Sequence, residues 1–184
     1  MEDKTLLDTS EQVPASVADA VDSDVDKHQL IVFKLGAEEY AIHIDQIKEV
    51  VLTPRVTKMP QTPSYVKGVA NIRGSILSIV DLEEKFGIQA GGEADEENAH
   101  NYTLVAESND FNVGILVKEV PNTLSVMTSD IDETVNVVQN DAEEGNYVLG
   151  IVKIEERLVI LIDLFQIMQT NDLSSVLKEP LLSE

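Results

Sequence analysis

The chain has 184 residues, no cysteine, and a formal net charge of −21 that comes from 13 basic and 34 acidic side chains. Its hydrophobic fraction of 43% is that of a folded protein, while this excess of negative charge disfavours nucleic acid and anionic membrane surfaces as partners. The lack of cysteine excludes disulfides and thiolate chemistry and fits a cytoplasmic location. The most apolar run, LVILI at residues 158–162, is far too short to insert across a bilayer.

The two ends of the chain differ in composition from the segment between them. Residues 1–28 contain eight acidic and two basic residues and no aromatic one, which predicts a disordered acidic tail. Residues 29–168 have the apolar patterning of a folded domain. Residues 169–184 are expected to be a C-terminal tail, in which SVLKEPLLSE can add a helical turn before Pro180.

The first part of the domain alternates between apolar and polar residues, which is the pattern of half-buried strands. In HQLIVFKLGAEEYAIHI, residues 28–44, two such strands flank a hairpin connection at residues 36–39. Asp45 is predicted to cap a short helix, DQIKEVV, over residues 45–51. One further helical turn is expected at SYVKG, residues 64–68.

Three hairpins are predicted in the rest of the domain. The first turns at Arg73-Gly74 and leads into a short helix, DLEEKFG, at residues 81–87. An acidic segment at residues 91–101 is expected to be a mobile loop, and the strands YTLVAES and FNVGILV then form a second hairpin around Asn109-Asp110. The third hairpin, YVLGIVKIEERLVILIDL, turns at Glu155-Glu156.

An internal repeat suggests that the domain consists of two similar β-lobes. GVANIRGSILSIVDL at residues 68–82 aligns without gaps on GIVKIEERLVILIDL at residues 150–164, with glycine first and Asp-Leu last in both. IKEV at residues 47–50 likewise recurs as VKEV at residues 117–120. The lobes are expected to share one continuous apolar core that includes Leu35, Ile42, Ile76, Ile79, Leu158 and Ile160.

The residue types argue against an enzyme. Each of the three histidines, His28, His43 and His100, lacks a neighbouring ligand or nucleophile at a useful spacing, and surface positions account for them better. The chain has no phosphate-binding or nucleophile-elbow motif. No catalytic residue, metal site or cofactor is therefore predicted.

The distribution of charge singles out one stretch. From Val50 to Val80 the chain has no acidic residue, yet it carries Arg55, Lys58, Lys67 and Arg73. The gap can be an accident of a strand-rich segment, but a surface that meets an acidic partner explains it somewhat better. Arg73-Gly74 has two explanations of about equal weight: an ordinary tight turn, or a turn that presents a rigid guanidinium to a partner.

Three segments together resemble the CheW family of bacterial chemotaxis coupling proteins over roughly residues 29–168. They are VFKLGAEEYAIHIDQIKEV, TPSYVKGVANIRGSILSIVDL and LGIVKIEERLVILIDL. The resemblance implies a mainly β fold of two intertwined, five-stranded, SH3-like β-barrel lobes around a shared apolar core, with a few short helices. It also implies a non-enzymatic adaptor, associated with membrane receptor arrays, that joins the cytoplasmic hairpin of methyl-accepting chemoreceptors to the regulatory domain of the histidine kinase CheA.

The resemblance also assigns roles to particular residues. The receptor contact would use Ile47, Glu49, Val50, Asn71 and Arg73. The kinase contact would lie on the first lobe, at Val51, Thr53, Pro54 and Val56. Glycine would be required for backbone geometry at Gly68, Gly74, Gly114 and Gly150.

Two other functions stay open at this point. The same scaffold can serve a receptor–kinase pathway of surface motility rather than of swimming, because the acidic tail and the 91–101 loop lie outside the family pattern. A β-barrel that binds a small ligand is the second alternative, although the sequence offers no convergent set of polar residues for one.

Overall fold

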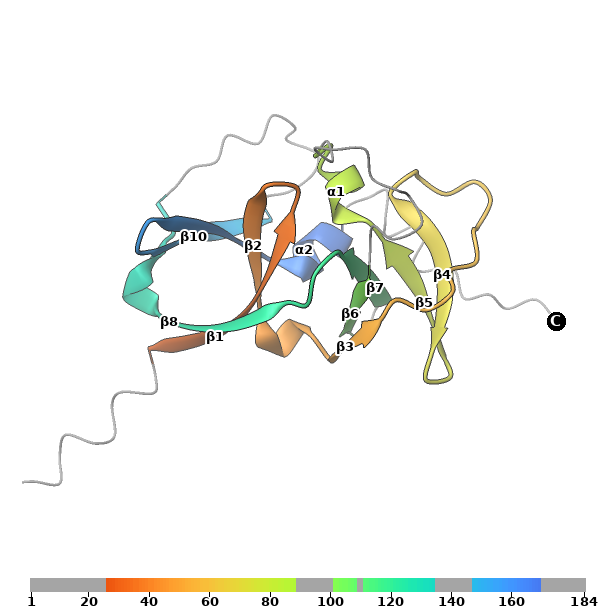
Figure 1. Cartoon of the computed structure of the whole chain (residues 1–184), viewed down its shortest axis with the longest axis horizontal. Helices are drawn as coiled ribbons and strands as arrows, with labels where there is room; N and C mark the ends of the chain where they lie inside the picture. Colours follow the sequence, from red (N-terminus) through yellow and green to blue (C-terminus); the bar gives the residue numbers. More distant parts are fainter. Residues whose placement is uncertain (1–25, 89–100, 109–110, 135–146, 170–184) are drawn as a thin grey trace, which may run out of the picture.

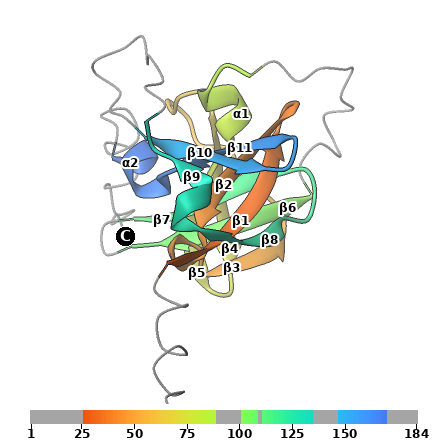
Figure 2. The same cartoon turned by 90° about the vertical axis from the view of Figure 1, so that its left-hand side faces the viewer.

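The structure, a computed structural model, describes residues 26–88, 101–108, 111–134 and 147–169. These residues form eleven strands, two short α-helices and two 3-10 helices. The strands make two sheets that lie side by side along the long axis of the molecule (Figures 1 and 2). None of the helices among these residues is long and apolar enough to cross a bilayer.

The larger sheet defines the six-stranded lobe. Its strands, in spatial order, are β8 (Asn122–Met127), β1 (Lys27–Leu35), β2 (Glu38–His43), β11 (Arg157–Ile162), β10 (Val148–Ile154) and β9 (Ile131–Asp132). The 3-10 helix η2 (Thr128–Asp130) joins β8 to β9, and the α-helix α2 (Leu164–Met168) follows β11.

The smaller sheet defines the five-stranded lobe. Its order is β3 (Glu49–Leu52), β6 (Tyr102–Glu107), β7 (Asn112–Val117), β5 (Ser75–Val80) and β4 (Val66–Ile72). The 3-10 helix η1 (Ile44–Gln46) leads into β3, and α1 (Leu82–Lys85) follows β5. An isolated bridge from Thr57 to Val69 of β4 takes the place that the two-residue strand β9 has in the other lobe.

The chain exchanges strands between the lobes. β1 and β2 pair with β8 and β11 from the far end of the sequence, whereas β3, which directly follows them, pairs with β6 of the other lobe. Each lobe also contains one parallel contact, β2 with β11 and β5 with β7. The predicted fold, mainly β with two intertwined lobes, is therefore confirmed.

One apolar cluster joins the two lobes, as the sequence predicted. Ile31, Phe33 and Ile42 from the six-stranded lobe pack with Leu104 and Ile115 from the five-stranded lobe, and all are buried. Two smaller clusters fill the interior of the five-stranded lobe, and one fills the interior of the six-stranded lobe. Burial of this apolar surface is the main source of stability in a chain with few aromatic residues.

Two of the six residues expected in the core lie on the surface. Leu35, Ile42 and Ile79 are at most 1% exposed and Ile160 is half-buried, but Ile76 and Leu158 are 58% and 59% exposed. The neighbouring Leu77 and Val159 take the inward positions instead. Because successive side chains of a strand point to opposite faces, only one residue of each pair can be inside.

The repeat seen in the sequence is present in the strand pairing. Gly68 and Gly150 each follow a bulge, and Asp81 and Asp163 each cap the helix that follows their hairpin. The match of IKEV with VKEV is wrong, however. Glu49 pairs with Val105 and Asn122 with Val32, so Asn122, rather than Glu119, is the counterpart of Glu49.

Several local predictions need correction. Residues 45–51 form η1 and the strand β3 instead of one helix, and the helical turn expected at 64–68 is the start of β4. Pairing with β6 outweighs the local helical pattern in the first case. β8 and α2 were not predicted, whereas α1 and the turn at Glu155-Glu156 were.

The ends of the domain are also clearer in the structure. β1 begins at Lys27, so the last two residues assigned to the acidic tail, Lys27 and His28, pair with β8. The rest of that tail, most of the 91–101 loop, the turn at Asn109-Asp110 and most of the C-terminal tail lie outside the described residues.

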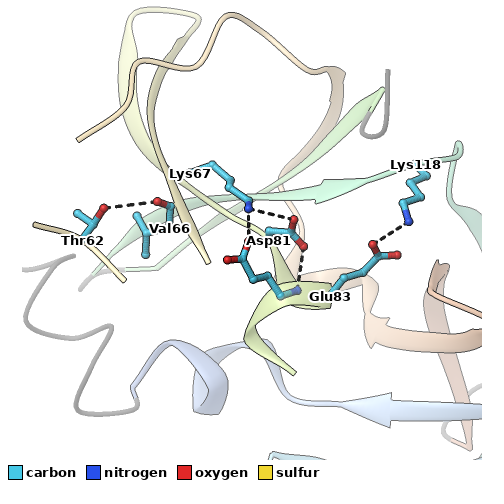
Figure 3. Close-up of polar contacts among 7 residues, drawn as sticks. Thr62, Val66, Lys67, Asp81, Glu83 and Lys118 are labelled. Carbon is cyan, nitrogen blue, oxygen red and sulfur yellow. Dashed lines mark hydrogen bonds and ion pairs between the residues drawn. The ribbon is translucent and has the colours of Figure 1, made fainter. Parts of the chain in front are cut away.

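A polar cluster surrounds α1 (Figure 3), and one of its members, Glu83, also contacts the other lobe. The buried carboxylate of Glu83 accepts a hydrogen bond of 2.7 Å from the backbone N of Gly36, in the β1–β2 turn of the other lobe. It also pairs with the Nζ of Lys118 at 2.7 Å. The adjacent Glu84 is exposed and bonds Lys67, and this hydrogen bond lowers the pKa of Glu84. Glu83 is thus the residue that holds the two lobes in register at this point.

The contrast between these neighbours can be tested. Glu83→Ala should lower the free energy of unfolding by about 2–4 kcal/mol, because it leaves a partly buried amide and a partly buried ammonium without a carboxylate. Glu84→Ala removes an exposed ion pair and should cost less than about 1 kcal/mol. Urea unfolding of both variants measures the difference. Equal losses would mean that Glu83 has no special role in joining the lobes.

Candidate functional site

The turn between β4 and β5 places Arg73 in a fixed backbone position. Asn71 pairs with Ile76 across the hairpin, and the turn residues Arg73 and Gly74 have φ of +52° and +90°. The Oδ1 of Asn71 accepts a 2.9 Å hydrogen bond from the N of Gly74 and so closes the turn. A side chain on such a closed hairpin is presented with little backbone freedom.

Arg73 forms an ion pair with Glu49, although no acidic residue is near it in sequence. The Nε of Arg73 lies 2.8 Å from the Oε2 of Glu49, whose side chain is 21% exposed, while that of Arg73 is 77% exposed. Glu49 lies on β3 and Arg73 between β4 and β5, at the two opposite edges of the five-stranded sheet. The pair therefore links these edges where the sheet curls around the small cluster of Ile72, Leu77 and Val105.

The equivalent turn of the six-stranded lobe shows which residues the turn itself requires in order to fold. Its hairpin between β10 and β11 has Glu155 at the position of Arg73, with the same φ of +52°. The counterpart of Glu49 there is Asn122. The same turn thus forms without an arginine at the turn position and without a glutamate at the position of Glu49. Folding of the hairpin therefore does not require the Arg73–Glu49 pair. This favours a contact function for the pair.

Exposed apolar side chains lie on the elements that carry the ion pair. Val50 and Leu52 point outward from β3 with 41% and 72% exposure, and Ile76 lies three residues from Arg73 with 58% exposure. Ile47, which was grouped with Val50, is half-buried against the shared core. Leu52 and Ile76 were not identified as exposed residues from the sequence. Strand alternation could have done so, because Leu52 lies on the same face of its strand as Val50, and Ile76 lies on the opposite face from Leu77.

The residues assigned to a kinase contact belong mainly to the wall of the barrel. Val51 packs against the cluster around Val105, and Val56 packs against a cluster that contains Ala70. The Oγ1 of Thr53 lies 3.1 Å from the Oγ1 of the buried Thr103, and Pro54 is half-buried. The surface of this segment is formed by other side chains, Leu52 and Arg55.

Two cations of the acid-free stretch have partners within the fold. Lys67 pairs with Glu84 and lies 3.7 Å from Asp81 (Figure 3), and Arg73 pairs with Glu49. Arg55 and Lys58 are exposed, and neither forms an ion pair within the described part of the chain. The unneutralised positive charge of this stretch is therefore limited to the loop between β3 and β4.

Three of the four glycines singled out from the sequence lie in crowded places. A Cβ on Gly68, whose φ is +137°, would come within 2.0 Å of the carbonyl O of Thr57. A Cβ on Gly150 would lie 2.9 Å from the O of Asp132, and one on Gly114 would meet the side chain of Thr103 at 2.6 Å. Gly74 differs, because nothing lies within 4 Å and only its positive φ restricts substitution.

The histidine and acidic side chains are the candidate metal ligands of the described residues. No three histidine or acidic side chains among them are close enough to hold a metal ion. His28 and His43 stack edge to face with ring centroids 5.3 Å apart, and His28 lies 3.1 Å from the Oγ1 of Thr128. The most distinctive site in this part of the molecule is thus the ion pair with its apolar flank.

Comparison with known proteins gives consistent matches over the domain. The model of the CheW-like domain matches residues 29–172. The chemotaxis protein CheW of Helicobacter pylori is 32% identical over 160 residues, which cover 87% of this chain and 93% of that protein. The CheW of Klebsiella aerogenes is 32% identical over 148 residues, with coverage of 80% and 86%.

Two further matches extend the comparison. The crystal structure of the scaffolding protein TtCheW from Thermoanaerobacter tengcongensis superposes with a TM-score of 0.67 at 27% identity, over 82% of this chain and 93% of that one. Protein PilI of Pseudomonas aeruginosa is 34% identical over 90 residues, which is about half of each chain.

The crowding at Gly68 leads to a direct test against Gly74. Gly68→Ala should lower the free energy of unfolding by about 3 kcal/mol or more, because the new methyl group overlaps a backbone carbonyl. Gly74→Ala should cost only about 1–2 kcal/mol, the penalty for a positive φ in open space. Chemical denaturation gives both values. A smaller loss for Gly68→Ala than for Gly74→Ala would contradict the close approach to Thr57.

Proposed function

Since the chain belongs to the CheW-like domain family, we propose that it is a non-enzymatic adaptor that couples transmembrane chemoreceptors to the histidine kinase CheA. The observation that carries this proposal is the ion pair between Arg73 and Glu49 on a turn that forms in the other lobe without it. An adaptor of this kind acts at the cytoplasmic face of the membrane, in association with receptor arrays.

The receptor contact is proposed at the ion pair and its apolar flank. Val50 and Ile76 supply exposed apolar surface on which a helix of the receptor's cytoplasmic hairpin can lie. Glu49 engages the Nε of Arg73, so the terminal amino groups of the 77% exposed guanidinium are available to carboxylate or carbonyl groups of the partner. The ion pair would thereby fix the orientation of the partner helix, with Asn71 holding the turn.

The kinase contact is proposed on the segment from β3 to the loop that follows it. Val51, Thr53, Pro54 and Val56 shape this segment through their packing in the barrel wall. Leu52 and Arg55 present the exposed surface. Their role would be to meet the regulatory domain of CheA, in which case the two partners occupy neighbouring faces of one lobe.

The alternatives differ in their support. The partial likeness to PilI keeps a pathway other than the chemotaxis of the CheW relatives as a second candidate for the same adaptor role. A small-ligand barrel is disfavoured, because the interior of each lobe in the described structure is filled by its own apolar cluster. An adaptor role in another pathway leaves the role proposed for Arg73 unchanged.

Substitution of Arg73 tests the receptor contact. Arg73→Ala should weaken binding of a receptor cytoplasmic fragment by about 1–3 kcal/mol, the range for a charge-assisted hydrogen bond. Arg73→Lys should not restore full affinity, because an ammonium group lacks the planar donor geometry of arginine. Isothermal titration against the receptor fragment measures both effects, and a separate titration against the CheA regulatory domain should be unchanged.

Arg157→Ala provides the matched control. Arg157 is also an exposed arginine in an ion pair, with Glu39 at 2.7 Å, but it lies on the other lobe. Its loss should leave the affinity for the receptor fragment unchanged. If Arg73→Ala binds the receptor fragment with full affinity, Arg73 is only a turn residue and not a contact residue. If Arg157→Ala loses as much affinity as Arg73→Ala, the loss is a general effect of charge.

A further inference from the structure

The six-stranded lobe has an exposed leucine, Leu158, at the repeat position equivalent to Ile76, and the proposed function does not account for it. Leu158 occupies the position in β11 that Ile76 occupies in β5, three residues after the positive-φ residue of the turn. The two side chains are 59% and 58% exposed. In Figure 1 the β10–β11 hairpin, in blue, ends at the left and the β4–β5 hairpin at the lower right, so the two hairpins lie at opposite ends of the molecule.

Leu158 is the exposed end of a larger apolar surface. Ile160 lies on the same face of β11 and pairs with Tyr40 of β2 on one side and Ile151 of β10 on the other. The ring of Tyr40 contacts that of Phe86 at 5.9 Å. All four residues are partly buried, and Tyr40, Phe86 and Ile160 pack against the core that joins the two lobes, so this surface is the outer margin of that core.

Aromatic side chains continue this surface to the end of α1. Phe86 stacks on Tyr147 with ring centroids 5.1 Å apart and an interplanar angle of 3°. Three of the eight aromatic residues of the chain thus gather in one half-exposed group. We call the whole surface the Leu158 face, which consists of Tyr40, Phe86, Tyr147, Ile151, Leu158 and Ile160.

The charges around the Leu158 face are mainly negative. Arg157 is held by Glu39 through two hydrogen bonds of 2.9 and 2.7 Å, so its charge is already matched. The exposed carboxylates of Glu38, Glu155 and Glu156 then face a single exposed cation, Lys153, which pairs with Leu158 across the hairpin. An apolar surface with this rim favours a partner that carries positive charge beside its apolar residues.

The neighbouring segments of the chain have the wrong charge to cover this face. Residues 89–100 and 135–146, which adjoin Ile88 and Tyr147, contain acidic residues but no lysine or arginine. They would bring further carboxylates to a rim that is already acidic. A separate partner with basic residues satisfies the same surface at lower electrostatic cost.

We propose that the Leu158 face is an additional protein-docking surface, separate from the proposed receptor and kinase contacts. It binds an amphipathic helix with an aliphatic stripe and flanking basic residues. The aliphatic stripe would lie across Leu158 and Ile160 and meet the rings of Tyr40 and Phe86. The basic residues would face Glu155 and Glu156 at the turn. This surface does not involve Arg73, so it allows a third partner to bind alongside the two of the proposed adaptor function.

Synthetic peptides provide the probe. One helical peptide carries leucine at positions i, i+3, i+4 and i+7 with lysine elsewhere, and a second replaces every lysine by glutamate. Fluorescence anisotropy at physiological salt should show that the full chain binds the lysine peptide and not the glutamate peptide. Leu158→Ser should weaken binding by at least about tenfold, the loss expected when a buried leucine contact is removed.

Val120→Ser is the matched control, because Val120 is 58% exposed and lies outside both the Leu158 face and the proposed receptor and kinase contacts. This control variant should bind the lysine peptide as tightly as the unmodified chain does. Both serine variants should have the melting temperature of the unmodified chain. The double variant Glu155→Lys/Glu156→Lys should bind the lysine peptide more weakly than the unmodified chain does, and it should bind the glutamate peptide. Equal binding by Leu158→Ser and the unmodified chain, or equal losses in both serine variants, would overturn the proposal.

Sedimentation of the chain without peptide tests whether a second copy of the chain occupies the Leu158 face. A monomer is expected for the unmodified protein and for Leu158→Ser. If the unmodified protein dimerises and Leu158→Ser does not, the face joins two copies of this chain, and the proposed basic partner is wrong.

Discussion

The exchange of strands between the lobes is the constraint on which the rest of the structure depends. β1 and β2 complete a sheet whose other strands come from the end of the domain, while β3 to β7 form the other sheet. The six-stranded lobe therefore cannot form without strands from both sides of the five-stranded lobe, whose own strands are contiguous in sequence. The shared cluster of Phe33, Ile42 and Leu104 is buried only when both lobes are in place. The result is a single rigid body, reinforced at its rim by Glu83.

Duplication within this rigid body separates what the fold requires from what it does not. Both lobes keep the bulge at the first glycine of the repeat, the aspartate that caps the following helix, and a positive φ at the turn. Only the five-stranded lobe places an arginine at that turn and a glutamate opposite it. Features present in both lobes are explained by folding, and features present in one lobe are the better candidates for partner contacts.

The sequence predicted the parts of the fold that depend on local pattern and on the repeat. Strand alternation identified the three hairpins, and the Asp-Leu of the first repeat marked the start of α1, whereas the helix α2 after the second Asp-Leu was not predicted. It could not place β3, whose partner β6 is some fifty residues away in sequence, nor decide which of Ile76 and Leu77 is inside. The Arg73–Glu49 contact was also beyond local pattern, because it depends on how the sheet curls.

Reversal of the ion pair tests most directly whether it serves a partner or the fold. The double variant Glu49→Arg/Arg73→Glu retains two opposite charges at the same positions, so its free energy of unfolding should lie within about 1 kcal/mol of that of the unmodified chain. Its affinity for a receptor cytoplasmic fragment, measured by titration, should fall at least about tenfold, because the exposed guanidinium is lost from the turn. Retention of receptor affinity in a stably folded double variant would contradict the assignment of Arg73 and Glu49 to a partner contact.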